Sequence, residues 1–480
     1  MIRSTAATLA TTLLLTLGAG GSPAAGQAAA AAQADAEGAI DPGYLQIRDL
    51  MNQSRKTRRT ASKALVDRGD PSLAFGIVDT LFFIPVRLRE EAIETLEALT
   101  GEKPGRSYWN WVEAVGRLGE TLRPAPGYEQ WKAILLSQID EEYRKILYAN
   151  VPAEIRLEEV VTGGVRVEGI PALDDPTMVP ADEVRYLKDD EEIFGIEIDG
   201  DARAYPLRIL DWHEMLNDTV AGQPVTLSYC TLCGSGVLYS TRLPDGRTFR
   251  FGTSGLLYRS NKLMLERESR SLWSNLTGEP VVGPQVGSGL QLEYVPHTRT
   301  TWADWKRRHP ETLVVKIDRD LKEVARKHGF DYRPGEADER RRNVSFPVWK
   351  KNDVLPREEE VYALRLDGAA KAYPLETLLK TGIVNDTVGD RPVVLVADDG
   401  TGAVRAYERG NLEFQGDGEV LVGTGGVRYR VEEGRLAPVD AEAGEPLRRL
   451  PGHFAFWFGW YAFFPRTEVW EGPVVGAGAG

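Results

Sequence analysis

Apolar residues recur at every third or fourth position through the first third of the chain, the period of an amphipathic helix. The clearest segments are residues 89–99, which stop before Gly101, the aromatic run that begins at Tyr108, and residues 131–148. We therefore expect a small helical domain over residues 43–150. Its tryptophans, Trp109, Trp111 and Trp131, are expected in the core, because large aromatic side chains dominate protein interiors.

After residue 155 the pattern changes to short segments in which apolar and polar residues alternate, as in half-buried strands. Residues 165–168 and 193–198 both show this alternation. Asp199-Gly200 favours a tight hairpin turn, and 203–205 would be the returning strand. Residues 207–216 are expected to form a short helix that carries His213.

The same β-rich pattern occurs twice. Residues 199–207 match residues 367–375, and 217–220 recur as 385–388, both 168 positions later; near the end, Trp302 and Trp305 align with Trp457 and Trp460, 155 positions later. We therefore predict an α+β protein: an N-terminal helical domain followed by two tandem copies of a β-rich α+β unit. The copies would span 155–318 and 358–472, with a charged linker at 319–357.

Asn-Asp follows the predicted short helix in both copies, as Asn217-Asp218 and Asn385-Asp386. Residues that both copies retain are expected to serve the scaffold. Asn and Asp after a helix are typical of a cap or a turn.

The N-terminus has the pattern of an export signal. Arg3 precedes an apolar run at 6–17 that is too short to span a bilayer, and small residues follow. We interpret residues 1–32 as a signal peptide with an Ala-rich segment, and expect a periplasmic or extracellular protein. After removal of the signal no transmembrane span is expected, because the apolar run at 454–464 is also too short. That run is expected to pack against the other copy.

The formal net charge is −13. Binding to nucleic acid phosphates needs a basic surface, so nucleic acid is not expected as a partner.

The only two cysteines of the chain, Cys230 and Cys233, form a C-x-x-C motif that runs into Gly234. A strand-like segment at 225–229 precedes them, which places the pair where a strand ends and the chain turns. In the second copy the equivalent positions hold Asp398 and Thr401. The fold therefore does not require the sulfurs, and the first copy is expected to carry the chemistry. The second copy would be structural, or a lid over the first.

Three interpretations of the motif remain open. The thiolates could hold a zinc or copper ion, with His213 as third ligand and His297 as an alternative or additional one. They could form a redox pair that reacts with a small-molecule or protein partner, which requires one thiol of lowered pKa. A structural disulfide in an interaction scaffold would close a very small loop and stabilise it weakly.

Residues 199–207, the Trp212-His213-Glu214 run, Asn217-Asp218 and residues 229–236 together resemble domain-of-unknown-function family 3179, an often exported family of bacteria and archaea. The similarity continues through 272–278 and 302–312. The family has no established activity. Some members are labelled selenoproteins, with selenocysteine in the C-x-x-C pair, which implies a redox role for Cys230 or Cys233. We therefore expect a thiol oxidoreductase-type site with one cysteine as nucleophile and the other resolving. His213 would be its base or orienting group, and a metal-binding module is the rival interpretation.

Overall fold

The computed structural model describes residues 40–333, 347, 349–350, 352–440, 442 and 444–472. The predicted signal peptide at 1–32 and a large part of the predicted linker lie outside these ranges. What is described of the linker begins with a helix, α11 (Arg319–His328).

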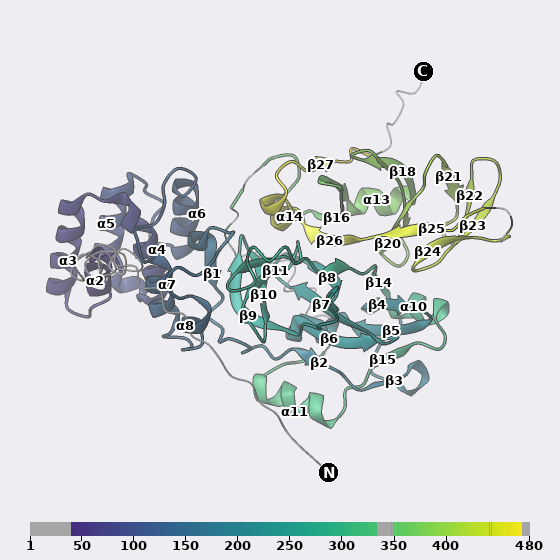
Figure 1. Cartoon of the computed structure of the whole chain (residues 1–480), viewed down its shortest axis with the longest axis horizontal. Helices are drawn as coiled ribbons and strands as arrows, with labels where there is room; N and C mark the ends of the chain where they lie inside the picture. The colour runs from purple at the N-terminus through teal and green to yellow at the C-terminus, as the bar shows by residue number, and fades with distance from the viewer. Residues whose placement is uncertain are drawn as a thin grey trace, which may run out of the picture.

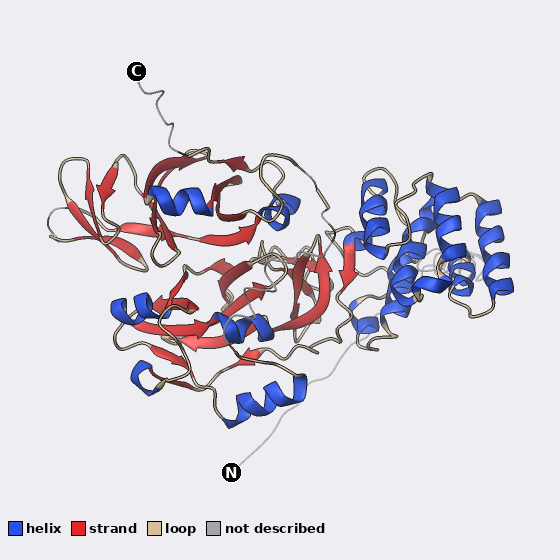
Figure 2. Cartoon of the chain, turned by 180° about the vertical axis from the view of Figure 1, so that it is seen from behind, coloured by secondary structure: helices blue, strands red, loops and turns tan. Residues whose placement is uncertain are grey.

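A bundle of helices forms the N-terminal part of the described chain (Figures 1 and 2). Helix α4 is almost wholly apolar and lies at its centre, with eight buried residues. The helices of the bundle are α2 (Gly43–Leu50), α3 (Arg55–Arg68), α4 (Ala74–Phe83), α5 (Glu90–Thr100), α6 (Tyr108–Leu118), α7 (Tyr128–Leu136) and α8 (Tyr143–Ile146). Helices α2, α5, α6 and α7 pack against α4, while α3 packs on α2 and α5, and α8 packs on α7.

Three five-stranded sheets make up the next part, which we call the first half. Their strand orders are β1-β9-β10-β11-β12, β13-β8-β7-β6-β2 and β14-β4-β5-β15-β3. The elements are β1 (Val160–Thr162), β2 (Leu173–Asp174), β3 (Met178–Pro180), β4 (Glu192–Ile198), β5 (Asp201–Pro206), α9 (Leu207–His213), β6 (Met215–Val220), β7 (Gln223–Cys230), β8 (Ser235–Ser240), β9 (Phe251–Tyr258), β10 (Asn261–Glu266), β11 (Leu272–Ser274), β12 (Pro280–Val282), β13 (Glu293–Tyr294), β14 (Thr298–Thr301), α10 (Trp302–Arg308) and β15 (Leu313–Val315).

The second half contains a four-stranded sheet, β26-β16-β17-β27, and an eight-stranded one, β18-β19-β20-β25-β24-β23-β22-β21. Figure 1 shows it in green to yellow beside the first half. Its elements are β16 (Glu360–Leu366), β17 (Ala369–Pro374), α13 (Leu375–Thr381), β18 (Ile383–Val388), β19 (Arg391–Asp398), β20 (Ala403–Glu408), β21 (Phe414–Gly416), β22 (Val420–Gly423), β23 (Arg428–Val431), β24 (Arg435–Pro438), β25 (Leu447–Leu450), β26 (Gly452–Phe456), α14 (Trp457–Phe463) and β27 (Glu468–Val469). The mixed content of helix and sheet, with a helical N-terminal part, agrees with the predicted α+β class.

The series β4-β5-α9-β6-β7-β8 has the same lengths and order as β16-β17-α13-β18-β19-β20, with every boundary 168 positions later. The hairpin turn predicted at Asp199-Gly200 is confirmed, since Ile198 pairs with Asp201 across it. Asp367-Gly368 makes the same turn between β16 and β17.

Two local predictions were wrong. Residues 165–168 form loop and turn, because Glu168 takes a left-handed conformation with φ of 51°. Asn217 and Asp218 lie within strand β6 and form neither a cap nor a turn.

The scaffold role of this Asn-Asp pair follows from its bonds. Asn217 Nδ2 donates to the Phe251 carbonyl, and the Phe251 N–H donates back to Asn217 Oδ1. Asn385 makes the same reciprocal pair of bonds with Phe414. Asp218 and Asp386 each accept a bond from a buried tyrosine hydroxyl, that of Tyr205 or Tyr373. In the first half these bonds satisfy the buried side chains of Asn217 and Asp218, while Asn385 and Asp386 make the same bonds nearer the surface.

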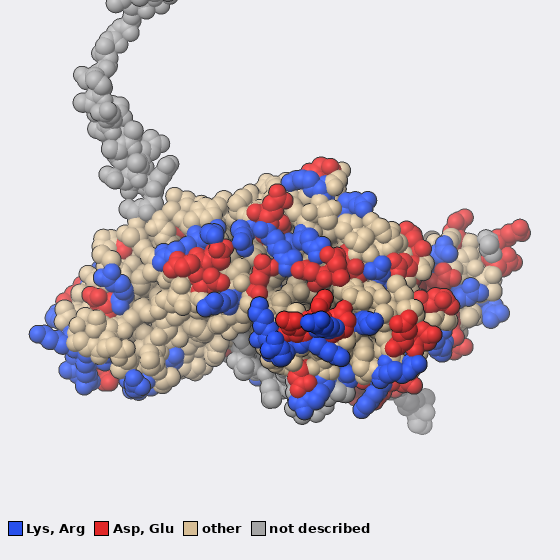
Figure 3. All heavy atoms as spheres, turned by 90° about the horizontal axis from the view of Figure 1, so that it is seen from below, with Lys and Arg blue, Asp and Glu red and all other residues tan. Residues whose placement is uncertain are grey.

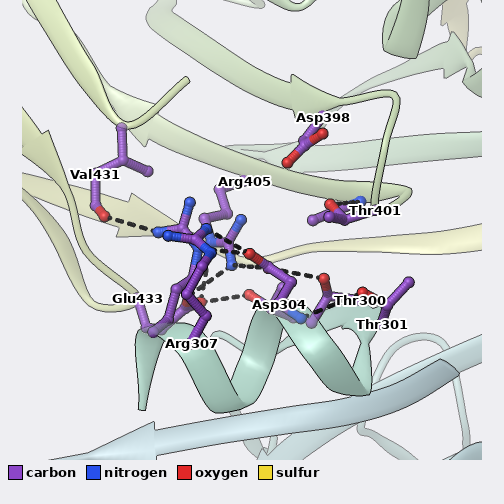
Figure 4. A network of polar contacts seen from close by, with 12 residues as sticks. Thr300, Thr301, Asp304, Arg307, Asp398, Thr401, Arg405, Val431 and Glu433 are labelled. Carbon is purple, nitrogen blue, oxygen red and sulfur yellow. Dashed lines mark hydrogen bonds and ion pairs between the residues drawn. The ribbon is translucent and has the colours of Figure 1, made fainter. Parts of the chain in front are cut away.

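The halves meet through a buried ionic cluster at one junction (Figure 4). Arg405 of β20 lies 2.7 Å from a carboxylate oxygen of Glu433 and 4.0 Å from Asp304 of α10. Thr298 of β14 donates to Glu433 at 2.5 Å. All four side chains are buried, and each buried charge at this junction has a partner of opposite charge.

No helix in the described ranges is long and apolar enough to cross a membrane. Over the middle and right of the face seen in Figure 3, Lys and Arg are interspersed with Asp and Glu.

Candidate functional site

The C-x-x-C motif occupies the hairpin turn between β7 and β8. Cys230 is the last residue of β7 and pairs with Ser235, the first residue of β8. Gly234 closes the turn at φ of +59°, a left-handed conformation that glycine adopts without strain. The predicted position of the pair, at a strand end before a sharp turn, is confirmed.

Both cysteines are free of any disulfide and buried, with exposed fractions of 2% for Cys230 and 0% for Cys233. Their sulfur atoms lie 2.9 Å apart, with the Cys233 thiol donating to Cys230. The turn thus holds the two sulfurs in contact, within reach of oxidation to a disulfide.

Neighbouring strands supply a polar wall to Cys233. Asn261 Nδ2, at the start of β10, lies 2.9 Å from the Cys233 sulfur and 3.0 Å from Ser235 Oγ. Asn275 Nδ2 donates to Ser235 Oγ at 3.2 Å and to Asn261 Oδ1 at 2.9 Å. Asn261, Asn275 and Ser235 are all buried. A buried, connected hydrogen-bond network of this kind fixes the position of each member.

The β9–β10 turn brings this wall into place through an unusual backbone. Arg259 and Ser260 both have left-handed φ angles, 48° and 63°. Such conformations cost non-glycine residues free energy and gather at functional sites. The Ser260 carbonyl lies 3.9 Å from the Cys230 sulfur. Arg259 anchors the turn by donating to Glu159 at 2.5 Å and to the Ala462 carbonyl at 2.8 Å.

A buried cation stands beside the thiols. Lys262 of β10 is 4% exposed, and its ammonium donates to the Glu214 carbonyl at 2.7 Å and lies 3.5 Å from a Glu214 carboxylate oxygen. Burial lowers the pKa of Lys262, while the charges of Glu214 and the two cysteines oppose that shift. Coulomb attraction is mutual, so the ammonium favours a thiolate at this site.

Glu214 itself is held in a strained conformation, with φ of 57° at the end of α9. Gly382 fills the equivalent place in the second half, at φ of 77°. A glutamate therefore occupies a position that favours glycine, and the strain is retained only where the thiols and Lys262 lie nearby.

The two thiols differ in acidity. Burial raises the pKa of Cys230, but hydrogen bonds from the Cys233 side chain and from the backbone N–H groups of Cys233 and Lys262 outweigh it and hold that pKa below its ordinary value. Burial and the adjacent Cys230 raise the pKa of Cys233 well above its ordinary value. The first proton therefore leaves Cys230, and the remaining proton stays on Cys233.

The second half covers the pair. The Phe456 N–H donates to the Cys233 carbonyl at 2.8 Å, and Phe456 and Phe458 form one apolar cluster with the two cysteines. A Cβ atom added at Gly459 would lie 2.6 Å from Cys233 Cβ. The apolar run at 454–464 thus packs against the first half, as predicted. Leu232, between the cysteines, also packs against the helical domain, so three parts of the molecule meet here.

The structure does not bring the predicted histidines into this cluster. His213 Nδ1 lies 2.7 Å from the Pro171 carbonyl and Nε2 lies 2.6 Å from the Tyr332 hydroxyl. His297 lies against Phe194, with ring centres 5.6 Å apart. Burial lowers the pKa of each to about 4, so both are neutral at pH 7. Within the described ranges, no three side chains of His, Cys, Asp or Glu are grouped so that they could hold a metal ion.

Sequence reasoning missed Asn261 and Lys262. Both belong to β10, which reaches the cysteines only through the packing of one sheet against another. Asn275 lies in the 272–278 stretch that carried part of the family resemblance, but nothing there indicated a thiol contact. The β9–β10 turn that positions both residues, Arg259-Ser260, lacks the glycine or asparagine that marks a two-residue hairpin turn, so it gave no local signal.

Comparisons with known proteins give one result. The family model described as "Protein of unknown function (DUF3179)" matches residues 167–467, more than half of the chain. Comparison with curated proteins and with solved structures gave no match.

Proposed function

The chain belongs to the family of proteins of unknown function DUF3179, and we propose that Cys230 and Cys233 form its redox-active dithiol. One observation carries the proposal: two buried sulfurs lie 2.9 Å apart in a turn whose surroundings favour a thiolate at Cys230 and a thiol at Cys233. This asymmetry is what a nucleophile and its resolving partner require.

In the proposed cycle, the Cys230 thiolate attacks the electron acceptor and forms a covalent bond to it. The Cys233 sulfur then loses its proton and attacks the Cys230 sulfur, which releases the reduced acceptor and leaves a disulfide. Two electrons and two protons pass to the acceptor for each disulfide formed. Asn261 donates toward Cys233 at 2.9 Å and would steady the charge that develops there.

His213 enters this proposal as a positioning residue. Its bonds to Pro171 and Tyr332 fix the last turn of α9, directly before Glu214. The Glu214 carbonyl in turn accepts a hydrogen bond from the Lys262 ammonium. The ring therefore holds the Lys262–Glu214 pair beside the thiols, and it need not exchange a proton with them.

The test is a redox titration of the purified protein in glutathione buffers from about −320 to −180 mV, the span of cellular thiol buffers. Acid quenching, denaturation and maleimide labelling, read by mass spectrometry, would count free thiols at each potential. We expect a single two-electron transition within that span. A pair that stays in one state throughout would contradict the proposal.

Single cysteine variants provide the matched control. Cys233→Ser keeps a hydroxyl donor beside Cys230, so its thiol should be alkylated faster at pH 7 than that of Cys233 in Cys230→Ser, where burial still raises the pKa of Cys233. Equal rates would contradict the assignment of nucleophile and resolving residue. Zinc and copper analysis of the same preparations tests the rival, a metal-binding module. One equivalent of metal in wild type that is lost in both variants would replace the redox proposal.

We also infer that the two halves are copies of one unit. The constant offset of 168 between six consecutive elements supports this. A hydrogen bond that recurs 155 positions later supports it as well. Trp305 Nε1 donates to Thr312 Oγ1 at 2.8 Å, and Trp460 Nε1 donates to Thr467 Oγ1 at 2.9 Å. An experimental structure whose halves superpose strand for strand at these offsets would check the inference.

We propose, from the N-terminal pattern alone, that the protein is exported to the periplasm or beyond. Cell fractionation with N-terminal sequencing of the mature chain tests this, since cleavage is expected by residue 32.

A further inference from the structure

The burial of the thiols limits what can oxidise them. With exposed fractions of 2% and 0%, neither sulfur can be approached by a disulfide on the surface of another folded protein. An electron acceptor that reaches them must be small enough to enter the molecule.

A cavity of about 550 Å³ lies against the cover of the thiol pair. Phe458 belongs both to the lining of this cavity and to the apolar cluster that contains Cys230 and Cys233. The Phe458 side chain of α14 is therefore shared between the wall of the cavity and the apolar cluster of the thiols. The volume is in the range of small-molecule sites.

The walls of the cavity are suited to a flat apolar ring. Trp457, Phe458 and Tyr461 of α14 line it, together with Leu355 and Pro356. The Trp457 and Tyr461 rings have centres 5.1 Å apart, and Trp457 Nε1 is fixed by a bond to Asn352 Oδ1 at 3.2 Å. Aromatic walls of this kind bind planar conjugated molecules by stacking and apolar contact.

The charges around the cavity favour an uncharged ligand. Two carboxylates and two cations lie in its lining: Glu113, Asp353, Lys350 and Arg357. These sum to zero, so the cavity offers no net attraction to an anion or a cation.

We propose that this cavity binds a small, uncharged, planar two-electron acceptor of the quinone class, which oxidises the Cys230–Cys233 pair. The inference rests on the redox function proposed above. The Cys230 thiolate adds to a ring carbon of the quinone, and the Cys233 sulfur then attacks Cys230, breaking the carbon–sulfur bond. The two electrons and two protons of the dithiol go to the two quinone oxygens, giving a hydroquinone and a disulfide. Rotation of the Phe458 side chain opens the wall to the ring.

The test separates binding from reaction by using the full-length chain with Cys230→Ser and Cys233→Ser together. The probe is 1,4-naphthoquinone, and binding is followed by quenching of tryptophan fluorescence. We expect saturable binding, weakened about five- to tenfold by Tyr461→Ala, the size of effect given by loss of one aromatic contact. Tyr148→Ala, at a tyrosine that is 38% exposed outside the cavity, is the matched control and should leave affinity unchanged.

A second variant covers the case in which Tyr461→Ala fails to fold. Leu355→Trp would fill the cavity, and it should abolish binding while thermal unfolding shows a folded chain. No saturable binding to the double cysteine variant, or equal affinity with Leu355→Trp, would overturn the inference.

The reduced wild-type protein then tests the chemistry. Naphthoquinone should convert the pair to a disulfide, faster in Phe458→Leu, whose smaller side chain opens the shared wall. Binding without oxidation, together with a normal glutathione titration, would contradict the inference that a quinone oxidises the pair; failure of both oxidation and titration would contradict the redox function itself. A normal glutathione titration without naphthoquinone binding would contradict only the present inference.

Discussion

The two equivalent hairpin turns lie in opposite environments. The first, at Cys230–Ser235, is buried under α14 of the second half. The second, at Asp398–Ala403, is partly exposed at Asp398 and Thr401, beside α10 of the first half (Figure 4). Each half therefore presents its helix to the turn region of the other, but only one junction excludes water from the turn.

Two pairs of equivalent residues account for the difference. Where the first half has Val237 in β8, the second has Arg405 in β20; where α14 has Gly459, α10 has Asp304. In the first half Val237 is buried among apolar side chains, and Gly459 lets α14 lie directly against Cys233. Arginine and aspartate make an ionic junction that needs Glu433 to balance its charge. Small changes at matched positions thus decide whether the junction is an apolar cover or a charged contact.

The largest expected effect is at the ionic junction. Arg405→Val removes the nearest cation of the buried Glu433, which then keeps Arg449 at 3.7 Å, and we expect a loss of about 3–5 kcal/mol in the free energy of unfolding. Denaturant unfolding followed by fluorescence measures it. Arg448→Val removes a pair in which the arginine is 67% exposed, and it should cost under about 1 kcal/mol. Equal losses would mean that the buried cluster does not hold the halves together.

The apolar junction should be sensitive to added volume. Gly459→Ala would place a Cβ 2.6 Å from Cys233 Cβ, so we expect a destabilisation of about 1–3 kcal/mol and faster alkylation of the thiols as the cover lifts. Gly434→Ala is the control, since a Cβ there meets nothing within 4 Å. Unchanged alkylation in Gly459→Ala would show that α14 does not seal the site.

The third expectation concerns the pH dependence of the thiols. The pKa of Cys230 is lowered, so in the reduced protein its thiolate contributes stability above the ordinary thiol pKa. That contribution is lost as the pH falls through the lowered value. Lys262→Met removes the nearby ammonium and should raise the midpoint of the alkylation profile by about one pH unit, equivalent to ~1.4 kcal/mol.

Lys371→Met is the control for that experiment, because Lys371 pairs with Asp386 in the second half. It should leave the alkylation midpoint in place. A midpoint that moves with Lys371 and not with Lys262 would exclude a direct action of Lys262 on the thiols.

The smallest effect on stability is expected from adding the motif to the second turn. Asp398→Cys with Thr401→Cys, in a chain with Cys230→Ser and Cys233→Ser, should change the unfolding free energy by roughly 0.5 kcal/mol or less, because the turn is at the surface. The new thiols should titrate near the ordinary value of about 8.5. A lowered pKa there would show that the turn alone activates a cysteine.

Local patterns predicted much of the scaffold. The Asp199-Gly200 turn and the short helix before Glu214 follow from turn chemistry and periodicity, and the structure contains both. Residues 165–168 alternate like a strand but have no strand to pair with. Asn217-Asp218 resembles a helix cap in the sequence. In the structure the two side chains instead form hydrogen bonds with residues of other strands, which a local pattern cannot indicate.

The site was predictable in position but not in composition. The cysteines are visible in the sequence, and in the second half the equivalent turn forms with Asp398 and Thr401 in their places. Asn261 and Lys262 carry no local signal. They reach the sulfurs because the strained β9–β10 turn at Arg259-Ser260 folds back over the β7–β8 hairpin.

The sequence by itself determined the helical domain, the constant offset between the halves and the C-x-x-C turn, because each depends on periodicity, turn residues or repetition along the chain. Only the tertiary structure decided that the second half covers the turn, that Lys262 and Glu214 lie beside it, and that His213 and His297 bond elsewhere. Those contacts join residues up to 226 positions apart, from Gly459 to Cys233, and no local pattern specifies such packing.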